Sequence, residues 1–193
     1  MIRKKIDLPR PFTVVFILFW LLVASHNLGL WNYLRPAGEW KTITNDLYHF
    51  SVDYPTKWSA HTYGEYGDRG ASEIKLRIYG SLYSDFKISI EQMSAETPTL
   101  DDVVEWGERR IIHLNIGERR SRYIYRELSS RIDFVDGNKV IVRRYGNVER
   151  TFEEVYIARP DDMLMIRLQV DTEDLDQYLD DYYRIVDSFH TIE

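Results

Sequence analysis

The chain of 193 residues contains no cysteine. This absence excludes a disulfide framework, a lipid anchor on an N-terminal cysteine, and any cysteine-based nucleophile or metal site. A strong excess of one charge is also lacking, since 31 acidic and 25 basic residues leave a net charge of −6. We therefore expect a fold stabilised by packing alone and a protein with no nucleic-acid partner.

The common motifs of catalysis and cofactor binding are missing as well. The sequence has no Gly-x-Ser-x-Gly nucleophile elbow, no phosphate-binding Gly-x-x-x-x-Gly-Lys loop and no His-Glu-x-x-His zinc pair. Its five histidines are scattered, and acidic pairs such as Asp101-Asp102 lack the spacing of a calcium-binding loop. We expect no metal site, no cofactor and no enzymatic activity. The alternative, an unrecognised hydrolase, would require Asp, His and Ser side chains distant in the sequence to converge.

Long apolar runs are scarce, with one exception near the N-terminus. Residues 1–10 form a basic tip, and residues 11–34 are predominantly apolar. The side chains expected to hold this stretch in a bilayer are Phe12, Phe16, Phe19, Trp20, Leu21 and Trp31. A spanning helix needs about 20 apolar residues, so the polar residues 25–27 make the span short. They would lie near the far headgroups or face a partner helix.

The distribution of basic residues around this stretch predicts its orientation. Basic residues are more frequent before it than after it, so the N-terminus is expected in the cytoplasm and the bulk of the chain outside, in a periplasm, a lumen or the cell exterior. Residues 35–45 are then a linker and residues 46–193 an extracytoplasmic domain. The same features suit a signal peptide cleaved near residues 23–25, and both alternatives remain open at this point.

Beyond the linker, alternating apolar residues and turn signals predict about seven strands. Strand character is found at residues 48–54, 74–78, 86–90, 123–125 with 132–134, 140–142, 152–158 and 163–170. Hairpins are expected across residues 80–85, across Asp136-Gly137 and across residues 159–162.

Two helices are expected among these strands. Thr99 and Asp102 have the form of a capping box, and the helix they open carries the apolar stripe Leu100, Val103, Val104, Gly107, Ile111 and Leu114. Gly107 lies on that stripe, where the missing side chain would let the helix approach a sheet closely. Asp171 is expected to cap a final helix, whose apolar stripe is Leu175, Tyr178, Leu179, Tyr182, Val186 and Phe189.

Strands joined by short turns, with one helix in the middle and one at the end, indicate an α+β fold with a mainly antiparallel sheet flanked by helices. The order of Phe50-x-Val52-x-Tyr54-Pro55-x-x-Trp58, the mid-chain helix, the long hairpins and the final stretch 185–189 resembles the PsbP-like superfamily over residues 46–191. That group includes the extrinsic PsbP protein of photosystem II, a Ran-binding nuclear-transport factor and bacterial membrane-anchored relatives. The resemblance implies an αβα sandwich and a role in binding or assembly, and it assigns no site residue.

Two segments are candidate contact sites for a protein partner. Aromatic residues alternate with glycines in residues 58–70, where Trp58 is expected in the core and Tyr63 and Tyr66 are available for contacts. The basic cluster Arg119, Arg120 and Arg122 is a solvated face or a second contact site.

These observations lead to one main hypothesis and one alternative. The main hypothesis is a single-pass accessory or assembly subunit that docks its extracytoplasmic domain onto a larger membrane protein complex, of which a photosynthetic or respiratory complex is an example. The alternative is a membrane-tethered module that binds a small apolar or lipid-like molecule in a pocket between sheet and helix.

Overall fold

The computed structural model of the protein describes residues 15, 19–20, 38–62, 73–79 and 86–192. Phe19 and Trp20 are exposed. No helix in the described part of the chain is long and apolar enough to span a membrane. The other residues expected to form the anchor or to contact a partner through the aromatic loop lie outside the described residues: Phe12, Phe16, Leu21, Trp31, Tyr63 and Tyr66.

Along the described chain, short strands come first, and two helices and four long strands follow. The elements are β1 (Trp40–Asn45), β2 (Phe50–Pro55), β3 (Ser59–Thr62), β4 (Glu73–Tyr79), β5 (Lys87–Ser94), α2 (Leu100–Leu114), β6 (Arg126–Val135), β7 (Asn138–Gly146), β8 (Arg150–Arg159), β9 (Asp162–Asp171), α3 (Leu175–Asp187) and β10 (His190–Thr191).

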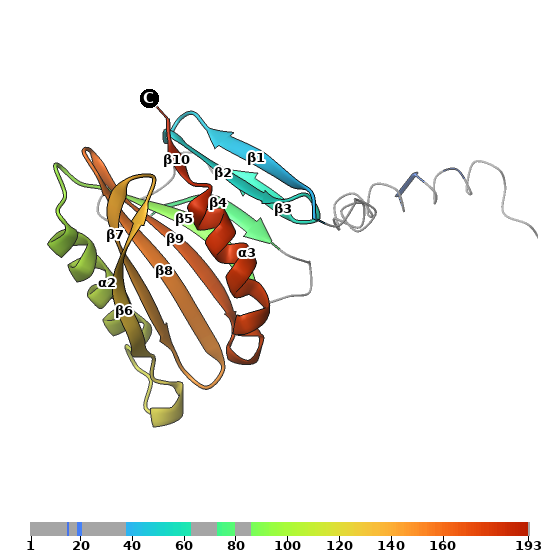
Figure 1. The fold of residues 1–193 in the computed structure, drawn as a ribbon. Helices are drawn as coiled ribbons and strands as arrows, with labels where there is room; N and C mark the ends of the chain where they lie inside the picture. The colour runs from blue at the N-terminus through green and yellow to red at the C-terminus, as the bar shows by residue number, and fades with distance from the viewer. Residues whose placement is uncertain (1–14, 16–18, 21–37, 63–72, 80–85, 193) are drawn as a thin grey trace, which may run out of the picture.

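The strands form two antiparallel sheets. The large sheet has the order β3-β4-β5-β9-β8-β7-β6, and a small sheet has the order β1-β2-β10. Helix α2 packs on one face of the large sheet over β7 and β8, whereas α3 lies on the other face between β9 and the small sheet (Figure 1). The protein is therefore an α+β sandwich, with a mainly antiparallel sheet flanked by helices as expected.

The two faces of the large sheet have different interiors. Val155 and Ile157 of β8 belong to the main hydrophobic core, which α3 and the small sheet complete, whereas Tyr156 between them belongs to a smaller core that α2 covers. In the main core, Phe189 stacks on Phe50 of β2 with 6.0 Å between ring centroids. This alternation follows from the period of two along a strand, and it buries both faces of β8 and β9.

Several local predictions are confirmed. Thr99 and Asp102 form the expected capping box, and Gly107 is buried where α2 meets the sheet. Asp136 and Gly137 both have positive φ angles in the β6–β7 turn, as a tight hairpin requires. The β8–β9 hairpin closes with Arg159 opposite Asp162, and Trp58 lies in the core.

Residues 40–45, predicted as the C-terminal part of a linker, belong to the folded domain instead. Residues 40–45 form β1, which pairs with β2 so that Ile43 lies opposite Val52. Most side chains of β1 are exposed or half-buried, so the strand carries too weak an apolar alternation to be recognised from the sequence.

The strand predicted at residues 123–125 is wrong. Ser121–Tyr123 is a short 3-10 helix, in which the Tyr123 N–H donates to the Arg120 carbonyl at 2.9 Å. Strand β6 begins only at Arg126. The alternating aromatic residues at these positions pack in a loop instead of pairing with a neighbouring strand.

Both helices differ in part from their predictions. Asp171 precedes a 3-10 helix at Thr172–Asp174 and makes no capping hydrogen bond with its side chain, and α3 starts at Leu175. In α2 the predicted stripe omits Trp106, which is buried, and includes Leu114, which is exposed. The buried face of α2 is therefore rotated slightly from the face that its apolar residues alone predict.

Candidate functional site

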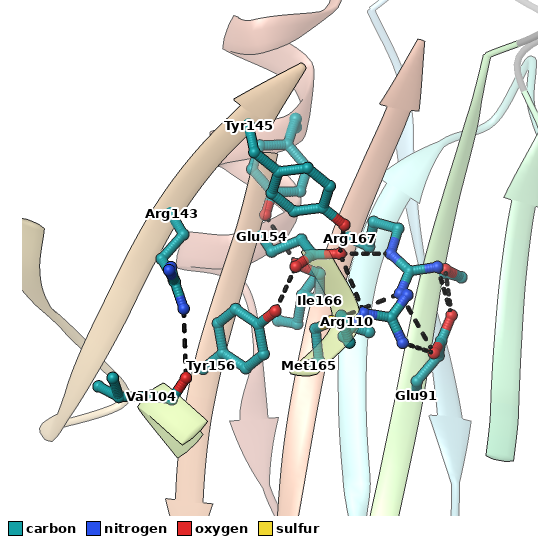
Figure 2. A network of polar contacts seen from close by, with 12 residues as sticks. Glu91, Val104, Arg110, Arg143, Tyr145, Glu154, Tyr156, Met165, Ile166 and Arg167 are labelled. Carbon is teal, nitrogen blue, oxygen red and sulfur yellow. Dashed lines mark hydrogen bonds and ion pairs between the residues drawn. The ribbon is translucent and has the colours of Figure 1, made fainter. Parts of the chain in front are cut away.

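A cluster of perturbed ionisable groups lies between α2 and the large sheet (Figure 2). At their centre is Glu154 of β8, whose side chain is fully buried. Its carboxylate accepts hydrogen bonds from the hydroxyls of Tyr145, at 2.6 Å, and Tyr156. It also accepts one from Nε of Arg167 at 2.6 Å. Residues from β7, β8 and β9 are thus joined at one carboxylate.

A second carboxylate completes the network. Glu91 of β5 pairs with Arg167 at 2.8 Å and with Arg110 of α2 at 3.1 Å, and Arg110 also lies 3.5 Å from Glu154. Two glutamates and two arginines therefore balance each other in the interior, as buried charges require. The network ties α2 to the middle of the sheet.

Burial controls the protonation of these groups. Burial raises the pKa of the Glu154 carboxyl, and the charge of Arg110 opposes that rise. Burial also raises the pKa of the Tyr145 and Tyr156 hydroxyls well above the ordinary value, with Glu154 adding to the effect. Both tyrosines consequently remain protonated at neutral pH and act as hydrogen-bond donors to Glu154.

The pKa of the Arg110 guanidinium is raised, although burial by itself would lower it. Burial disfavours its charge, but Glu154 and Glu91 more than offset this and raise the pKa of the guanidinium. Perturbed groups of this kind mark functional sites only where a substrate can reach them. Here Glu154, Tyr145 and Tyr156 are enclosed, so the arrangement serves as a structural polar core.

The opposite face of the large sheet carries a smaller polar group. Glu153 of β8 is buried there and pairs with Arg144 at 2.5 Å and with Arg131 at 3.5 Å, and the Tyr183 hydroxyl of α3 also donates to it. In the described part of the chain, no three His, Asp or Glu side chains are placed to hold a metal ion together. Neither polar group therefore offers a metal centre.

An accessible candidate site lies at one end of the large sheet, toward the lower edge of Figure 1. We call it the end surface, and define it by residues 117–128, 146–151 and 171–173. Backbone hydrogen bonds join its three segments: the Val148 N–H donates to the Arg122 carbonyl at 3.4 Å, and the Thr172 N–H to the Glu149 carbonyl at 2.9 Å.

Two asparagine side chains fix the shape of the end surface. Asn115, the C-cap of α2, holds Tyr125 by both backbone groups, accepting from its N–H at 2.8 Å and donating to its carbonyl at 2.9 Å. Asn147 donates to the Tyr123 carbonyl at 2.9 Å and accepts from the Arg150 N–H at 2.9 Å. The loop before β6 is therefore held at Tyr123 and Tyr125, just before the strand begins.

Three open depressions mark the end surface, and their linings differ in character. The largest, of about 510 Å³, is mainly apolar, with Ile124, Leu128 and Val148 beside the basic residues Arg122 and Arg126. A second, of about 350 Å³, and a third, of about 400 Å³, are mainly polar. Leu128 and Val148 are each 60% exposed. Exposed apolar side chains beside basic ones make the largest depression a candidate contact site.

The basic cluster predicted from the sequence lies on this end surface. The guanidinium groups of Arg120 and Arg122 lie 4.2 Å and 4.8 Å from the ring centroid of Tyr123, and Arg119 is exposed beside them. Such cation–π contacts keep the two charges at a defined position on the surface. The apolar contribution of Leu128 and Val148 was not predicted, because neither residue is distinguished by its neighbours in the sequence.

The described residues form an antiparallel αβα sandwich. Among these residues there is no accessible catalytic constellation. No known family model matches the sequence, and no curated protein matches it. The comparison with solved structures does find similar folds. The chain is similar to the solution structure of cyanobacterial PsbP, called CyanoP, from Synechocystis sp. PCC 6803, with a TM-score of 0.60, 15% sequence identity and coverage of 81% of this chain and 94% of that chain.

The protein thus has a PsbP-like fold, as the sequence resemblance implied. Weaker structural likeness extends to a protein from Bacteroides thetaiotaomicron, with a TM-score of 0.48, 10% identity and coverage of 79% of this chain and 48% of that chain. A protein of unknown function from Pseudomonas aeruginosa has a TM-score of 0.45 at 10% identity, covering 78% of this chain and 96% of that chain.

Proposed function

We propose that this protein is a non-enzymatic accessory or assembly subunit that docks through its end surface onto an acidic, partly apolar region of a larger membrane protein complex. The single observation that carries the proposal is the packing of the exposed Arg120 and Arg122 on the half-buried Tyr123 ring, beside the apolar depression. Arginine and tyrosine are the residues most enriched at the energetic centre of protein interfaces, where fixed rings and guanidinium groups lose little entropy on binding.

The location of this subunit is part of the same proposal. The apolar stretch at residues 11–34 would hold the chain in a bilayer, with the N-terminus in the cytoplasm and the folded domain outside. Strand β1 begins at Trp40, so residues 35–39 are left as the connection, which extends to at most about 18 Å. The domain would then remain beside the membrane, close to any partner embedded in it. The likeness to CyanoP makes a photosynthetic complex one candidate, and a respiratory complex is another.

The alternative function, binding of a small apolar molecule, has less support. The interface between the sheet and α3 is filled by side chains, with Phe86 and Tyr178 stacked at 4.1 Å between ring centroids. The interface between the sheet and α2 holds the Glu154 network and the Trp106–Tyr156 contact. A ligand between sheet and helix would have to displace these groups.

The test uses membranes from cells that make the full chain at its native level. After mild-detergent extraction, we expect the wild-type protein to migrate with a high-mass complex on a native gel. The variant Arg122→Glu should shift to low mass, because the reversed charge would face an acidic partner. Lys57→Glu carries the same charge change at an exposed turn outside the end surface, and it should migrate as the wild type does.

Two results would overturn the proposal. One is a wild-type protein that migrates alone although it is extracted from the membrane fraction. The other is an equal effect of Arg122→Glu and Lys57→Glu, which would make the loss of binding a matter of net charge. Unchanged thermal unfolding of the purified variants separates docking from folding.

A further inference from the structure

Strand β6 has an unusual surface for the edge of a sheet. It is the last strand of the large sheet, and none of the described strands pairs with its outer edge. Nine of its ten residues are exposed. They include Ile132 and Phe134, which are 56% and 68% exposed. Free edge strands promote pairing with other chains, and apolar side chains beside the edge add to that tendency.

The two faces of β6 have different chemistry. Ile132 lies opposite Ile141 of β7, which faces α2, so Ile132 and Phe134 project on the α2 side of the sheet. Arg131 lies opposite Val142, which faces the main core, so Arg131 and Asp133 project on the α3 side. The edge therefore presents apolar side chains on one face and one charge of each sign on the other.

The regular part of β6 is bounded on both sides. The pairing with β7 is irregular between Glu127 and Ser129, and the strand ends at Val135 before the hairpin turn. A bulge bends a strand and interrupts its pairing. The segment left for regular pairing is residues 129–135, and its central residue is Ile132.

We propose that β6 pairs with β6 of a second copy of this chain, antiparallel and centred on Ile132, so that the two large sheets become one continuous sheet. In this register Ile132 lies opposite Ile132, Ser130 opposite Phe134, and Arg131 opposite Asp133. The last pair occurs twice because the arrangement has a two-fold axis. Each face of β6 is then complementary to itself, with apolar contacts on one side and two ion pairs on the other.

The charges also select this register over its neighbours. A two-fold axis perpendicular to the sheet keeps each side chain on its own face. The axis must therefore pass between the two copies of one residue, and every alternative register is centred on another residue, never on a point between two residues. Centring on Arg131 would place Arg131 opposite Arg131, and centring on Asp133 would place Asp133 opposite Asp133. Like charges directly opposite across a strand pair are destabilising. Of these three registers, only the one centred on Ile132 pairs opposite charges.

The arginine of this interface is already held in position. Nη2 of Arg131 donates to the Tyr183 hydroxyl at 2.9 Å, and Nε lies 3.6 Å from the Asp133 carboxylate of the same strand. A side chain fixed before association loses less entropy when it binds. The contact is nevertheless only seven residues long on each chain, so we expect a weak dimer that cross-linking detects better than sizing does.

The absence of cysteine makes the test direct, because any introduced thiol is the only one in the chain. The full chain with Ile132→Cys, purified in detergent, should form a disulfide-linked dimer under mild oxidation, since the two thiols would face each other across the axis. The matched control is Ser129→Cys, also exposed on β6. Its thiols would be about 20 Å apart in the proposed register, and it should form little dimer.

Register and charge are tested by two further experiments. A mixture of Ser130→Cys and Phe134→Cys chains should give mainly the mixed dimer, because these positions lie opposite each other only between chains. Adding Asp133→Lys to Ile132→Cys should lower the yield of dimer about fivefold, since it makes two pairs of opposed like charges. Asp133 is exposed, and an unchanged melting temperature of the reduced protein confirms that the variant is folded.

Three results would overturn the inference: no dimer with Ile132→Cys, equal yields with Ile132→Cys and Ser129→Cys, or no dependence on the charge at residue 133. The first would mean that the edge stays free or binds another strand, and the other two would mean random collision. Because Arg122→Glu leaves residues 129–135 unchanged, the cross-link is expected to survive in a variant that no longer docks onto a larger complex. The two proposals can therefore fail separately.

Discussion

Gly107 lets α2 approach the sheet closely because it has no side chain. A Cβ atom there would lie 2.6 Å from Nη1 of Arg143 and 3.1 Å from the Tyr156 hydroxyl. Neither group can move freely, since Nη1 of Arg143 donates to the Val104 carbonyl and the Tyr156 hydroxyl donates to Glu154. Alanine is the better helix former by about 1 kcal/mol, but overpacking costs about 1–3 kcal/mol.

We therefore expect Gly107→Ala to lower the free energy of unfolding by about 1 kcal/mol in urea denaturation, with the steric cost exceeding the gain in helix propensity. Glu108→Ala changes the next, exposed residue of α2, and it should change the free energy by less than about 0.5 kcal/mol. A Gly107→Ala protein as stable as the wild type would contradict the close contact.

Glu154 is the residue on which the buried network depends. Replacing it with glutamine keeps the shape but leaves only one side-chain oxygen. With the amide nitrogen in the place of Oε1, the N–H groups face Tyr145, Arg167 and Arg110, and the remaining oxygen accepts only from Tyr156. Arg110 and Arg167 would then share the single carboxylate of Glu91. We therefore expect Glu154→Gln to lower the free energy of unfolding by about 3–5 kcal/mol. Glu149→Gln, at an exposed turn, should have almost no effect in the same measurement. Similar stability of both variants would show that Glu154 is already uncharged in the native protein.

At the scale of residues, contacts between near neighbours in the sequence were predictable, whereas contacts between residues far apart in the sequence were not. Thr99 and Asp102 interact across three residues, so the pattern that identifies a capping box also specifies its geometry. Glu153 and Glu154, by contrast, resemble two solvent-exposed charges in the sequence. Their burial depends on arginines that other strands and α2 supply.

At the scale of elements, Arg159 connects the two sheets. Its guanidinium donates to the carbonyls of Tyr48 and His49 just before β2, each at 3.1 Å, and pairs with Asp162 in its own hairpin. Arg159→Ala removes these bonds and leaves the buried Asp162 carboxylate without its cation. We expect the free energy of unfolding to fall by about 2–4 kcal/mol.

The distinctive readout of Arg159→Ala is local. Amide hydrogen exchange should become faster at residues 46–50 than in β7 and β8, because the turn before β2 loses its attachment to the large sheet. Arg150→Ala, which removes a half-exposed ion pair with Asp171 at 4.0 Å, is the control and should leave residues 46–50 unchanged. Uniform acceleration throughout the chain in Arg159→Ala would contradict a specific role in connecting the sheets.

The elements themselves were predictable where a repeating pattern or a turn motif defined them. Strands β2, β8 and β9, both helices and the hairpin at Asp136-Gly137 have such signals. Strand β1 lacked one because its side chains are exposed or half-buried. Residues 123–125 carried a false signal, since Tyr125 alternates as a strand residue would but packs its ring against Tyr145 and Phe152, at 6.3 Å and 5.5 Å between centroids.

At the scale of the whole molecule, buried tyrosines set the alkaline limit of stability. Burial is the largest cause that raises the pKa values of Tyr145, Tyr156 and Tyr182 well above the ordinary value. A group with a raised pKa in the folded state contributes stability that is fully present below its unfolded pKa, about 10 for tyrosine. That contribution is lost as the pH rises above this value. The protein should therefore become less stable above about pH 10.

A pH jump followed at 295 nm checks this expectation. Exposed tyrosines should ionise at once, and the buried ones only in a slower phase that coincides with the loss of far-ultraviolet circular dichroism. Tyr182→Phe should reduce the amplitude of the slow phase, and it should also lose about 1 kcal/mol of stability with the hydrogen bond from its hydroxyl to the Ile166 carbonyl. A single rapid ionisation of all tyrosines without unfolding would contradict the burial.

The sequence by itself determined what depends on composition or on neighbours within a few residues: the exclusion of disulfides, the strand alternation, the capping box, the hairpin turns and the α+β class. These interactions are short-range, so the residues that make them can be read together along the chain. Only the tertiary structure decided that β5 pairs with β9, which brings Glu91 to Arg167 across 76 residues. It also decided that Leu128 and Val148 line one depression together with the predicted Arg122. Long-range pairing follows from how faces and edges fit in three dimensions, and no local pattern encodes that fit.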